Sequence, residues 1–434
     1  MEKQKEEVIV EEAFGFAPKK PYFEIGKKWA SPHNFSPEVR NLFSLPERVL
    51  IHDVTLRDGE QTPGVAFTPK EKVHLALMLD RLGVHSIEPG LPATPEDREV
   101  IKTLMELRPR ARVVPLTRIK EEDVSAVIEL GCDGMLLEFG INPYLLKYVY
   151  RITPDILIEQ IAQFAKAGKE KGMYVEFMGW DAFRVEEWYL RDFFQAVAPY
   201  VDRVTISDTF GMGHPFATFR LVSNLRSWTG KPVGFHIHND FGLALAGSLM
   251  AISAGADMVH TSMNGLGERA GNVATEELVL ALEYLMGVPT GVDLSQLASV
   301  SAAFAEVSKV PLAPNKPVVG RRLFDVESGI VVHILQELEK TPIGGNAIFP
   351  YPPTLVGREP YQVQYGRGSG KNSVRMLLEH LEPNVQIPEE KIEKVTQKIK
   401  EAGLVLKSLL PDSILKQIVR EVLSDADLTS KEAI

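Results

Sequence analysis

Residues 233–240 read Val-Gly-Phe-His-Ile-His-Asn-Asp. The first three predict the start of a buried strand, in which successive side chains point to opposite faces. His236 and His238 are two positions apart, so both imidazoles would point the same way and could hold a divalent metal ion. Such a pair is common and carries little information alone, so two ordinary histidines are the competing interpretation. The rest of the chain must decide between the two.

Seven other short runs rich in β-forming residues accompany this one. Helix signals lie between them: Thr68 and Thr94 each provide an N-cap before a proline, and Gly83 and Gly255 stand where helices should stop. Strands alternating with helices are typical of an α/β protein of the (β/α)8 TIM-barrel class. An open doubly wound sheet is the rival, but no glycine-rich dinucleotide fingerprint follows the first strand. The expected strands are residues 49–54, 84–88, 112–116, 135–139, 173–178, 203–207, 233–238 and 258–263.

The barrel fold predicts where a functional site should lie. Active sites in this fold occupy the C-terminal ends of the strands. Asp58 follows the first expected strand, so we expect it to meet His236 and His238 across the barrel mouth. One carboxylate and two imidazoles suit a divalent ion such as Mg²⁺, Mn²⁺, Zn²⁺, Co²⁺ or Fe²⁺ and leave positions for a chelating substrate. The competing interpretation of Asp58 is a salt bridge with its neighbour Arg57.

The composition excludes several classes of protein. A net charge of -10 argues against nucleic acid or an anionic membrane as the main partner. The single cysteine, Cys132, excludes an internal disulfide framework and fits a reducing compartment. No apolar run approaches the length of a membrane span, and the charged N-terminus lacks a signal-peptide core. We therefore expect a cytoplasmic protein.

The alternating pattern covers only part of the chain. We expect residues 48–290 to form the barrel and residues 1–47, charged and punctuated by prolines, to form an N-terminal arm. Residues 291–372 would be a linker and subdomain, and residues 373–434 a helical C-terminal subdomain. The C-terminal part as a whole would range from mixed α/β to helical.

Three motifs together resemble a known family. Residues 55–61 read Thr-Leu-Arg-Asp-Gly-Glu-Gln, residues 236–244 read His-Ile-His-Asn-Asp-Phe-Gly-Leu-Ala, and residues 265–272 read Gly-Leu-Gly-Glu-Arg-Ala-Gly-Asn. In this order and on these barrel elements, the chain resembles the DRE-TIM metallolyases. Within that superfamily it is most similar to the 2-isopropylmalate, homocitrate and citramalate synthases.

The resemblance implies a role for several residues. Arg57 would stabilise a developing oxyanion, and Glu88 would orient Arg57 or a water molecule bound to the metal. A 2-oxo acid could bind the ion through its carboxylate and keto oxygens, which makes the keto carbon electrophilic. The metal ligands would be Asp58, His236, His238 and, as a further or supporting group, Asn272.

Other positions would contact the substrate. Gln61 and Thr209 match positions that contact its carboxylate or carbonyl, although a strand-end cap is a competing interpretation of Thr209. Glu138 and Glu176 end the fourth and fifth expected strands, where the similar homocitrate synthases place arginines. Two acids would repel the distal carboxylate of 2-oxoglutarate, so we expect 2-oxoglutarate to be a poor substrate.

The chain also departs from these synthases. Their acid–base histidines and tyrosine, in the C-terminal subdomain, correspond here to Val326, Val331 and Ile348. The residues that could substitute for them are His333, Tyr351 and Glu327, each with a structural or surface role as the competing interpretation.

The residues and the resemblance together predict an acyltransferase that condenses an acyl-CoA, with acetyl-CoA as the expected donor, with a 2-oxo acid. The product would be a 2-hydroxy dicarboxylic acid, the cofactor a divalent metal ion, and the assembly a homodimer. One alternative is a metal-dependent lyase or aldolase that cleaves a 2-hydroxy acid. The other is a catalytically silent binding protein on the same scaffold, which the missing acid–base groups would explain.

Overall fold

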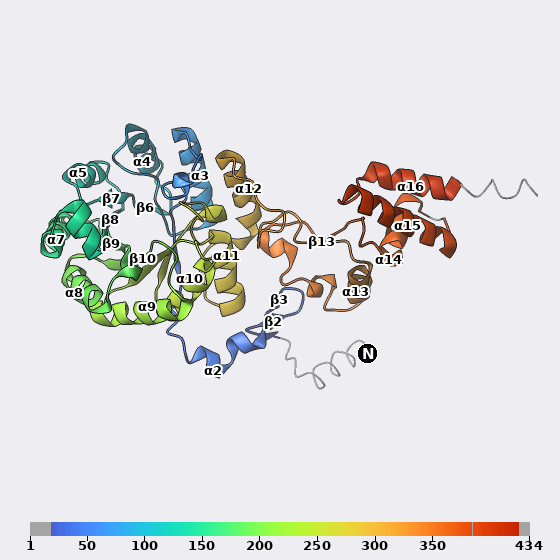
Figure 1. The fold of residues 1–434 in the computed structure, drawn as a ribbon, viewed down its shortest axis with the longest axis horizontal. Coiled ribbons are helices and arrows are strands. Elements are labelled where there is room, and N and C mark those ends of the chain that lie inside the picture. The colour runs from blue at the N-terminus through green and yellow to red at the C-terminus, as the bar shows by residue number, and fades with distance from the viewer. Residues whose placement is uncertain (1–18, 384, 425–434) are drawn as a thin grey trace, which may run out of the picture. The chain divides into compact units, whose positions relative to one another are not determined.

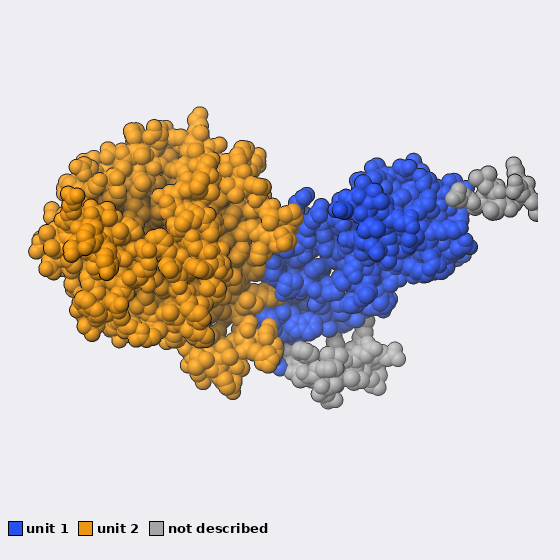
Figure 2. Space-filling view, in the orientation of Figure 1, with its two compact units in different colours: residues 1–30, 321–434 blue, residues 31–320 orange. Residues whose placement is uncertain are grey.

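The computed structural model describes residues 19–383 and 385–424, which divide into two compact units. Residues 31–320 form one unit, and the described parts of 1–30 and 321–434 form the other (Figure 2). Residues 1–18 of the expected arm and residues 425–434 of the expected C-terminal subdomain lie outside the described residues. Among the residues that are described, no helix is long and apolar enough to cross a membrane.

A parallel sheet forms the centre of the 31–320 unit (Figure 1). Its nine strands hydrogen-bond in the order β6-β5-β4-β12-β11-β10-β9-β8-β7. The strands are β4 (Leu50–Asp53), β5 (Ser86–Ile87), β6 (Arg112–Val113), β7 (Leu116–Arg118), β8 (Gly134–Gly140), β9 (Tyr174–Trp180), β10 (Arg203–Asp208), β11 (Val233–Ile237) and β12 (Met258–Thr261).

The two edge strands of this order, β6 and β7, correspond to the one strand expected over residues 112–116, which is interrupted at Val114 and Pro115 and continues to Arg118. The backbone N–H of Val114 donates to the carbonyl of Ile87 at 3.0 Å, and the N–H of Leu136 donates to the carbonyl of Pro115 at 3.1 Å. Hydrogen bonds on both sides of the break therefore join the strands into a ring. The TIM-barrel prediction is confirmed, with the third strand split because proline has no N–H to donate.

Helices surround this sheet (Figure 1). The Thr68 side chain caps α3 by accepting from the N–H of Glu71, whose carboxylate accepts from the N–H of Thr68 in return. Gly83 ends α3 at φ 97°, a conformation that glycine adopts at no steric cost. The helices are α3 (Pro69–Leu82), α4 (Pro95–Leu107), α5 (Glu121–Glu129), α7 (Pro154–Glu170), α8 (Glu187–Val197), α9 (Pro215–Thr229), α10 (Ala244–Ser253), α11 (Thr275–Leu280) and α12 (Leu297–Ser308).

Apolar side chains fill the space between sheet and helices. Phe177 of β9 lies against Phe194 of α8, with ring centroids 6.3 Å apart, and both side chains are fully buried. Burying one such side chain contributes about 1.5–3 kcal/mol. Buried aromatic side chains thus hold β9 against α8 on the outside of the sheet.

The second unit is smaller and mixed. Strands β1 (Lys19–Lys20), β2 (Phe23–Glu24) and β3 (Lys28–Trp29) form an antiparallel sheet, and β13 (Asp325–Val326) pairs in parallel with β14 (Gln362–Val363). One apolar cluster, which includes Val374, Val395 and Val419, joins its three C-terminal helices. The helices are α13 (Gly329–Glu339), α14 (Lys371–Leu381), α15 (Glu389–Leu406) and α16 (Asp412–Ser424).

Candidate metal centre

Asp58, His236 and His238 lie together at the C-terminal ends of the strands. The chain leaves β4 in a tight turn, in which the N–H of Asp58 donates to the carbonyl of Val54 at 2.8 Å. His236 is in β11 and His238 follows it, with its N–H donating to the carbonyl of Asp208 at 3.2 Å. The two imidazole Nε2 atoms are 3.3 Å apart, and Asp58 Oδ2 lies 3.7 Å from that of His236 and 3.8 Å from that of His238.

These three side chains fit a divalent metal ion. Ligands at bond lengths of about 2.0–2.2 Å from one ion stand about 3.0–3.6 Å apart, close to the separations in this cluster. Burial, together with the charge of the neighbouring imidazole, lowers the pKa of His236, and burial also lowers the pKa of His238 against the opposing influence of Asp58. Both imidazoles are therefore neutral at pH 7, which is the form that binds metal. All three side chains are buried.

Unpaired buried atoms around the cluster support the same conclusion. Within the described part of the chain, Asp58 Oδ1 and Asn272 Oδ1 are buried and have no hydrogen-bond partner. The Asn272 amide nitrogen donates to the carbonyl of Leu266 at 3.0 Å, which leaves its oxygen as the free end. A Cβ at Gly267 would stand 2.4 Å from Asn272 Nδ2 and 3.1 Å from Asp58 Oδ1. The loop therefore needs glycine at 267, where its backbone passes against both side chains.

Arg57 lies beside the cluster and is held by Glu88. Its Nε donates to Glu88 Oε2 at 2.6 Å, and its Nη1 donates to Asp58 Oδ2 at 3.1 Å. Burial opposes ionisation of Glu88, but the charge of Arg57 and the hydrogen bond from His52 outweigh it and lower the pKa of Glu88 to about 2. The Arg57 Nη2 is buried without an acceptor among the described residues, so this charged donor is available to an anionic ligand.

Gln61 and Thr209 occupy different environments. Gln61 is exposed, and its Oε1 lies 3.4 Å from Arg57 Nη1. Thr209 Oγ1 accepts from the N–H of Asp181 at 2.8 Å and lies 3.1 Å from Ser207 Oγ. Its hydroxyl thus caps the neighbouring strand end, and its contact with a substrate stays a prediction.

Glu138 and Glu176 do not lie at the same depth. Glu138 is half-buried near the end of β8, and burial, partly offset by Arg57, raises its pKa to about 7. Glu176 is fully buried inside the barrel, where its carboxylate accepts from Tyr174 Oη at 2.8 Å, pairs with His260 Nε2 at 3.1 Å and also bonds the Thr205 hydroxyl. Charge repulsion of a substrate at the mouth therefore rests on Glu138.

A polar layer that was not predicted from the sequence lies beneath the metal cluster. His52 of β4 and His260 of β12 are register partners, and their rings lie 4.4 Å apart inside the barrel. His52 Nε2 lies 3.0 Å from Glu88 Oε1 and its Nδ1 lies 2.6 Å from Ser86 Oγ. The available signal was a histidine in each of two expected strands whose other residues are largely apolar.

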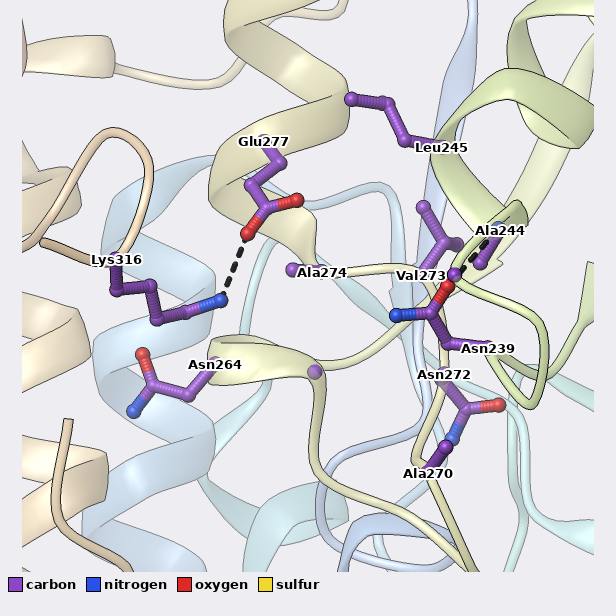
Figure 3. A pocket seen from close by; sticks show the side chains of 12 residues that line it. Asn239, Ala244, Leu245, Asn264, Ala270, Asn272, Val273, Ala274, Glu277 and Lys316 are labelled. Carbon is purple, nitrogen blue, oxygen red and sulfur yellow. Dashed lines mark hydrogen bonds and ion pairs between the residues drawn. The ribbon is translucent and has the colours of Figure 1, made fainter. Parts of the chain in front are cut away.

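A pocket of about 350 Å³ opens next to Asn272 (Figure 3). Asn239, Asn264 and Lys316 give it a polar lining, and Lys316 Nζ pairs with Glu277 at 2.8 Å. The Asn239 side chain is fixed because its Oδ1 accepts from the N–H of Ala244 at 3.0 Å. The loops after β11 and β12 thus leave space for a ligand beside the candidate metal centre.

In the other unit, apolar residues that pack together occupy the positions where the resemblance would place acid–base groups. Val326, Val331 and Ile348 belong to one hydrophobic cluster. Among the possible substitutes, Glu327 accepts from the N–H of Gly368 at 2.6 Å, the Tyr351 ring packs on Phe324, and His333 is exposed.

The family can be assigned by comparison with known proteins. The model of the HMGL-like family matches residues 48–303, which include every barrel strand and the candidate metal centre. The chain belongs to the HMGL-like family. A homocitrate synthase, AksA, of Methanopyrus kandleri is 37% identical over 393 residues, covering 89% of this chain and 96% of the relative.

Two further HMGL-like relatives come from Methanocaldococcus jannaschii. Its 2-isopropylmalate synthase is 36% identical, covering 83% of this chain and 69% of the relative. Its (R)-citramalate synthase, CimA, is 35% identical, covering 86% and 74%. Among solved structures, the hydroxymethylglutaryl-CoA lyase of Pseudomonas aeruginosa superposes with a TM-score of 0.56 at 21% identity, covering 63% of this chain and 96% of the lyase. At that identity the likeness supports the barrel fold alone.

Proposed function

We propose that this protein catalyses a divalent-metal-dependent Claisen condensation of an acyl-CoA, with acetyl-CoA as the expected donor, with a 2-oxo acid. Hydrolysis of the resulting thioester by water then releases CoA and gives a 2-hydroxy dicarboxylic acid. The observation that carries the proposal is the preformed cluster of Asp58, His236 and His238 with the Arg57 guanidinium beside it. The names of the three relatives described above, homocitrate, 2-isopropylmalate and (R)-citramalate synthase, support the same reaction class.

Each residue in and beside the cluster has its own proposed role. Asp58, His236 and His238 would hold the ion, with Asn272 as a further or supporting ligand. Such an ion supplies Lewis acidity, which polarises the keto group of the 2-oxo acid. Arg57, whose Nη2 has no acceptor among the described residues, would donate to the oxygen that becomes negative when the acyl-CoA enolate attacks. Glu88 keeps the guanidinium in one orientation, so little reorganisation is needed during the reaction.

Substrate selection would depend on the groups around this cluster. Gln61, next to Arg57, and Thr209 are proposed to contact the carboxylate or carbonyl of the 2-oxo acid. Glu138 would disfavour a second carboxylate on the substrate once it is ionised. Glu176 is not proposed to contact the substrate, because its carboxylate already bonds three partners inside the barrel; its proposed role is to support the residues around it.

A lyase or aldolase reaction is the second candidate. The observation that favours it is the apolar packing of Val326, Val331 and Ile348, where a condensing enzyme of this group would carry acid–base side chains. A catalytically silent protein would share this feature, but it would have no use for the buried Arg57 donor, which has no acceptor in the described part of the chain.

Thiol release from acetyl-CoA distinguishes these functions. The purified protein is assayed with pyruvate, 2-oxoisovalerate and 2-oxoglutarate in the presence of Mg²⁺, Mn²⁺ or Zn²⁺. Condensation requires thiol release that depends on both the 2-oxo acid and the metal, and that His238→Ala abolishes while the exposed His74→Ala does not. Cleavage of a 2-hydroxy acid without thiol release would instead establish the lyase, and absence of both reactions the silent protein.

We also propose that the protein is a homodimer, the assembly that the sequence resemblance implies. Sedimentation equilibrium of the full chain measures the mass directly. A single species at the monomer mass of 48.3 kDa would contradict the proposal.

A further inference from the structure

We propose a second metal site inside the barrel, formed by His52, Glu88 and His260. One ligand atom from each lies within 4.8 Å of the other two, and all three side chains are buried. None of them is a ligand in the Asp58, His236 and His238 cluster, although Glu88 also holds Arg57, so the site is an additional one and goes beyond the proposed function.

The strand register brings the three ligands together. His52 of β4 and His260 of β12 are directly opposite in neighbouring parallel strands, and Glu88 directly follows β5, the neighbour of β4 on its other side. His52 Nε2 and Glu88 Oε1 are 3.0 Å apart, a separation that two ligands of one ion adopt at about 2.1 Å from it. The imidazoles of His52 and His260 lie 4.4 Å apart between ring centroids, and one ring nitrogen of each lies within 4.8 Å of the other and of a Glu88 oxygen.

Each ligand is supported from behind in the way that metal-binding residues usually are. His52 Nδ1 bonds Ser86 Oγ at 2.6 Å, and His260 Nε2 bonds the Glu176 carboxylate at 3.1 Å. A metal-bound histidine typically donates its second ring nitrogen to such a partner, which fixes its tautomer and orientation. The second oxygen of Glu88 is likewise occupied by Arg57.

An unpaired atom supplies an independent argument. His260 Nε2 donates its proton to Glu176, so the neutral ring carries a lone pair on Nδ1. This nitrogen is buried and has no hydrogen-bond partner among residues 19–383 and 385–424. Leaving a buried polar atom unpaired carries a free-energy cost. A cation coordinated by Nδ1 would remove that cost.

The donor set indicates the kind of cation. Two imidazole nitrogens and one carboxylate oxygen, without the oxygen ligands that a chelating substrate would add at the Asp58 cluster, suit Zn²⁺, Co²⁺ or Fe²⁺, whereas Mg²⁺ and Ca²⁺ prefer sites made of oxygen ligands. An ion here would fix the Glu88 carboxylate from the side opposite Arg57. Without an ion, His52 Nε2 donates its proton to Glu88 and Nδ1 accepts from Ser86; a bound ion would replace that proton and move the ring proton to Nδ1. The rival explanation is that only the proton is present.

Metal stoichiometry tests the proposal without any activity measurement. Full-length protein is stripped with a chelator, dialysed against a low micromolar concentration of ZnCl₂, and analysed by inductively coupled plasma mass spectrometry. We expect wild type to bind two zinc ions per chain and His236→Ala/His238→Ala to bind one. His52→Phe should also bind one, because the phenyl ring keeps the packing and removes both nitrogens. His74→Phe, at an exposed position of α3, is the matched control and should still bind two.

Two results would overturn the proposal. One is a wild-type protein that binds a single zinc ion, all of which is lost in His236→Ala/His238→Ala. The other is a second ion that survives both His52→Phe and His260→Phe. Because the Phe variants could fail to fold, thermal unfolding of His236→Ala/His238→Ala provides a second measurement. ZnCl₂ should raise its Tm, since binding to the native state alone stabilises it, and an unchanged Tm contradicts the site.

Discussion

Replacing Glu88 by glutamine should destabilise the protein by about 3 kcal/mol at pH 7. The Glu88 side chain is completely buried and its Oε2 accepts from Arg57 Nε at 2.6 Å. Lowering the pKa of Glu88 from its ordinary value of 4.5 to about 2 corresponds to about 3 kcal/mol, since one pKa unit is worth about 1.4 kcal/mol. Removing one partner of a buried ion pair typically costs about 3–5 kcal/mol, which agrees with this figure.

The loss should depend on pH in a definite direction. Because the folded-state pKa is depressed, the stabilisation is fully present above pH 4.5 and is lost as the pH falls through about 2. The difference between wild type and Glu88→Gln should therefore be largest at neutral pH and shrink on acidification. Glutamine keeps the shape of the side chain, so a cavity contributes little to the change.

Urea unfolding of the metal-free proteins at pH 7 and near pH 3 measures both effects, with equal m-values as the condition for comparing them. Glu129→Gln, at an exposed position at the end of α5, is the matched control and should change stability by less than about 0.5 kcal/mol. A loss below about 1 kcal/mol for Glu88→Gln at pH 7, or a loss that grows on acidification, would refute the view that the Arg57–Glu88 pair is held as ions inside the barrel.

Three further predictions address the site and its surroundings. His238→Ala should weaken binding of a divalent ion at the Asp58 cluster by about 100-fold or more, whereas His74→Ala, at an exposed position, should not. Calorimetric titration with Mn²⁺ measures the affinity, and equal affinities of His238→Ala and wild type would contradict the proposed ligands. Glu138 has a pKa raised to about 7, so it gains its negative charge as the pH rises through 7. The ratio of kcat/KM for 2-oxoglutarate to kcat/KM for pyruvate should therefore fall between pH 6 and 8, and Glu138→Gln should make this ratio independent of pH. Burial raises the pKa of Asp53 from 3.8 to about 7, so ionisation of Asp53 destabilises the native state as the pH rises between these values. The free energy of unfolding of Asp53→Asn should therefore increase relative to that of wild type from pH 5 to pH 8. A constant difference between the two proteins over this range would exclude the effect.

The sequence by itself determined the elements and the chemistry of the mouth. Helix starts such as Thr68-Pro69 are local, because the cap and the helix it begins are adjacent in the chain. The side chains of Asp58, His236 and His238 could be placed because parallel strands of a barrel end at one face. Strand periodicity, turn residues and motif order all act over short distances, so they can be recognised without a folded structure.

Only the tertiary structure decided which polar residues reach the mouth and which remain below it. Alternation along a strand says which face a side chain occupies, but the depth of that side chain in the barrel depends on the stagger between neighbouring strands. Glu176 and Glu138 therefore looked equivalent in sequence, although Glu176 is enclosed by Tyr174, Thr205 and His260. The pairing of His52 with His260 joins positions 208 residues apart in the chain, and a register of this kind is created by the closed sheet rather than by either segment.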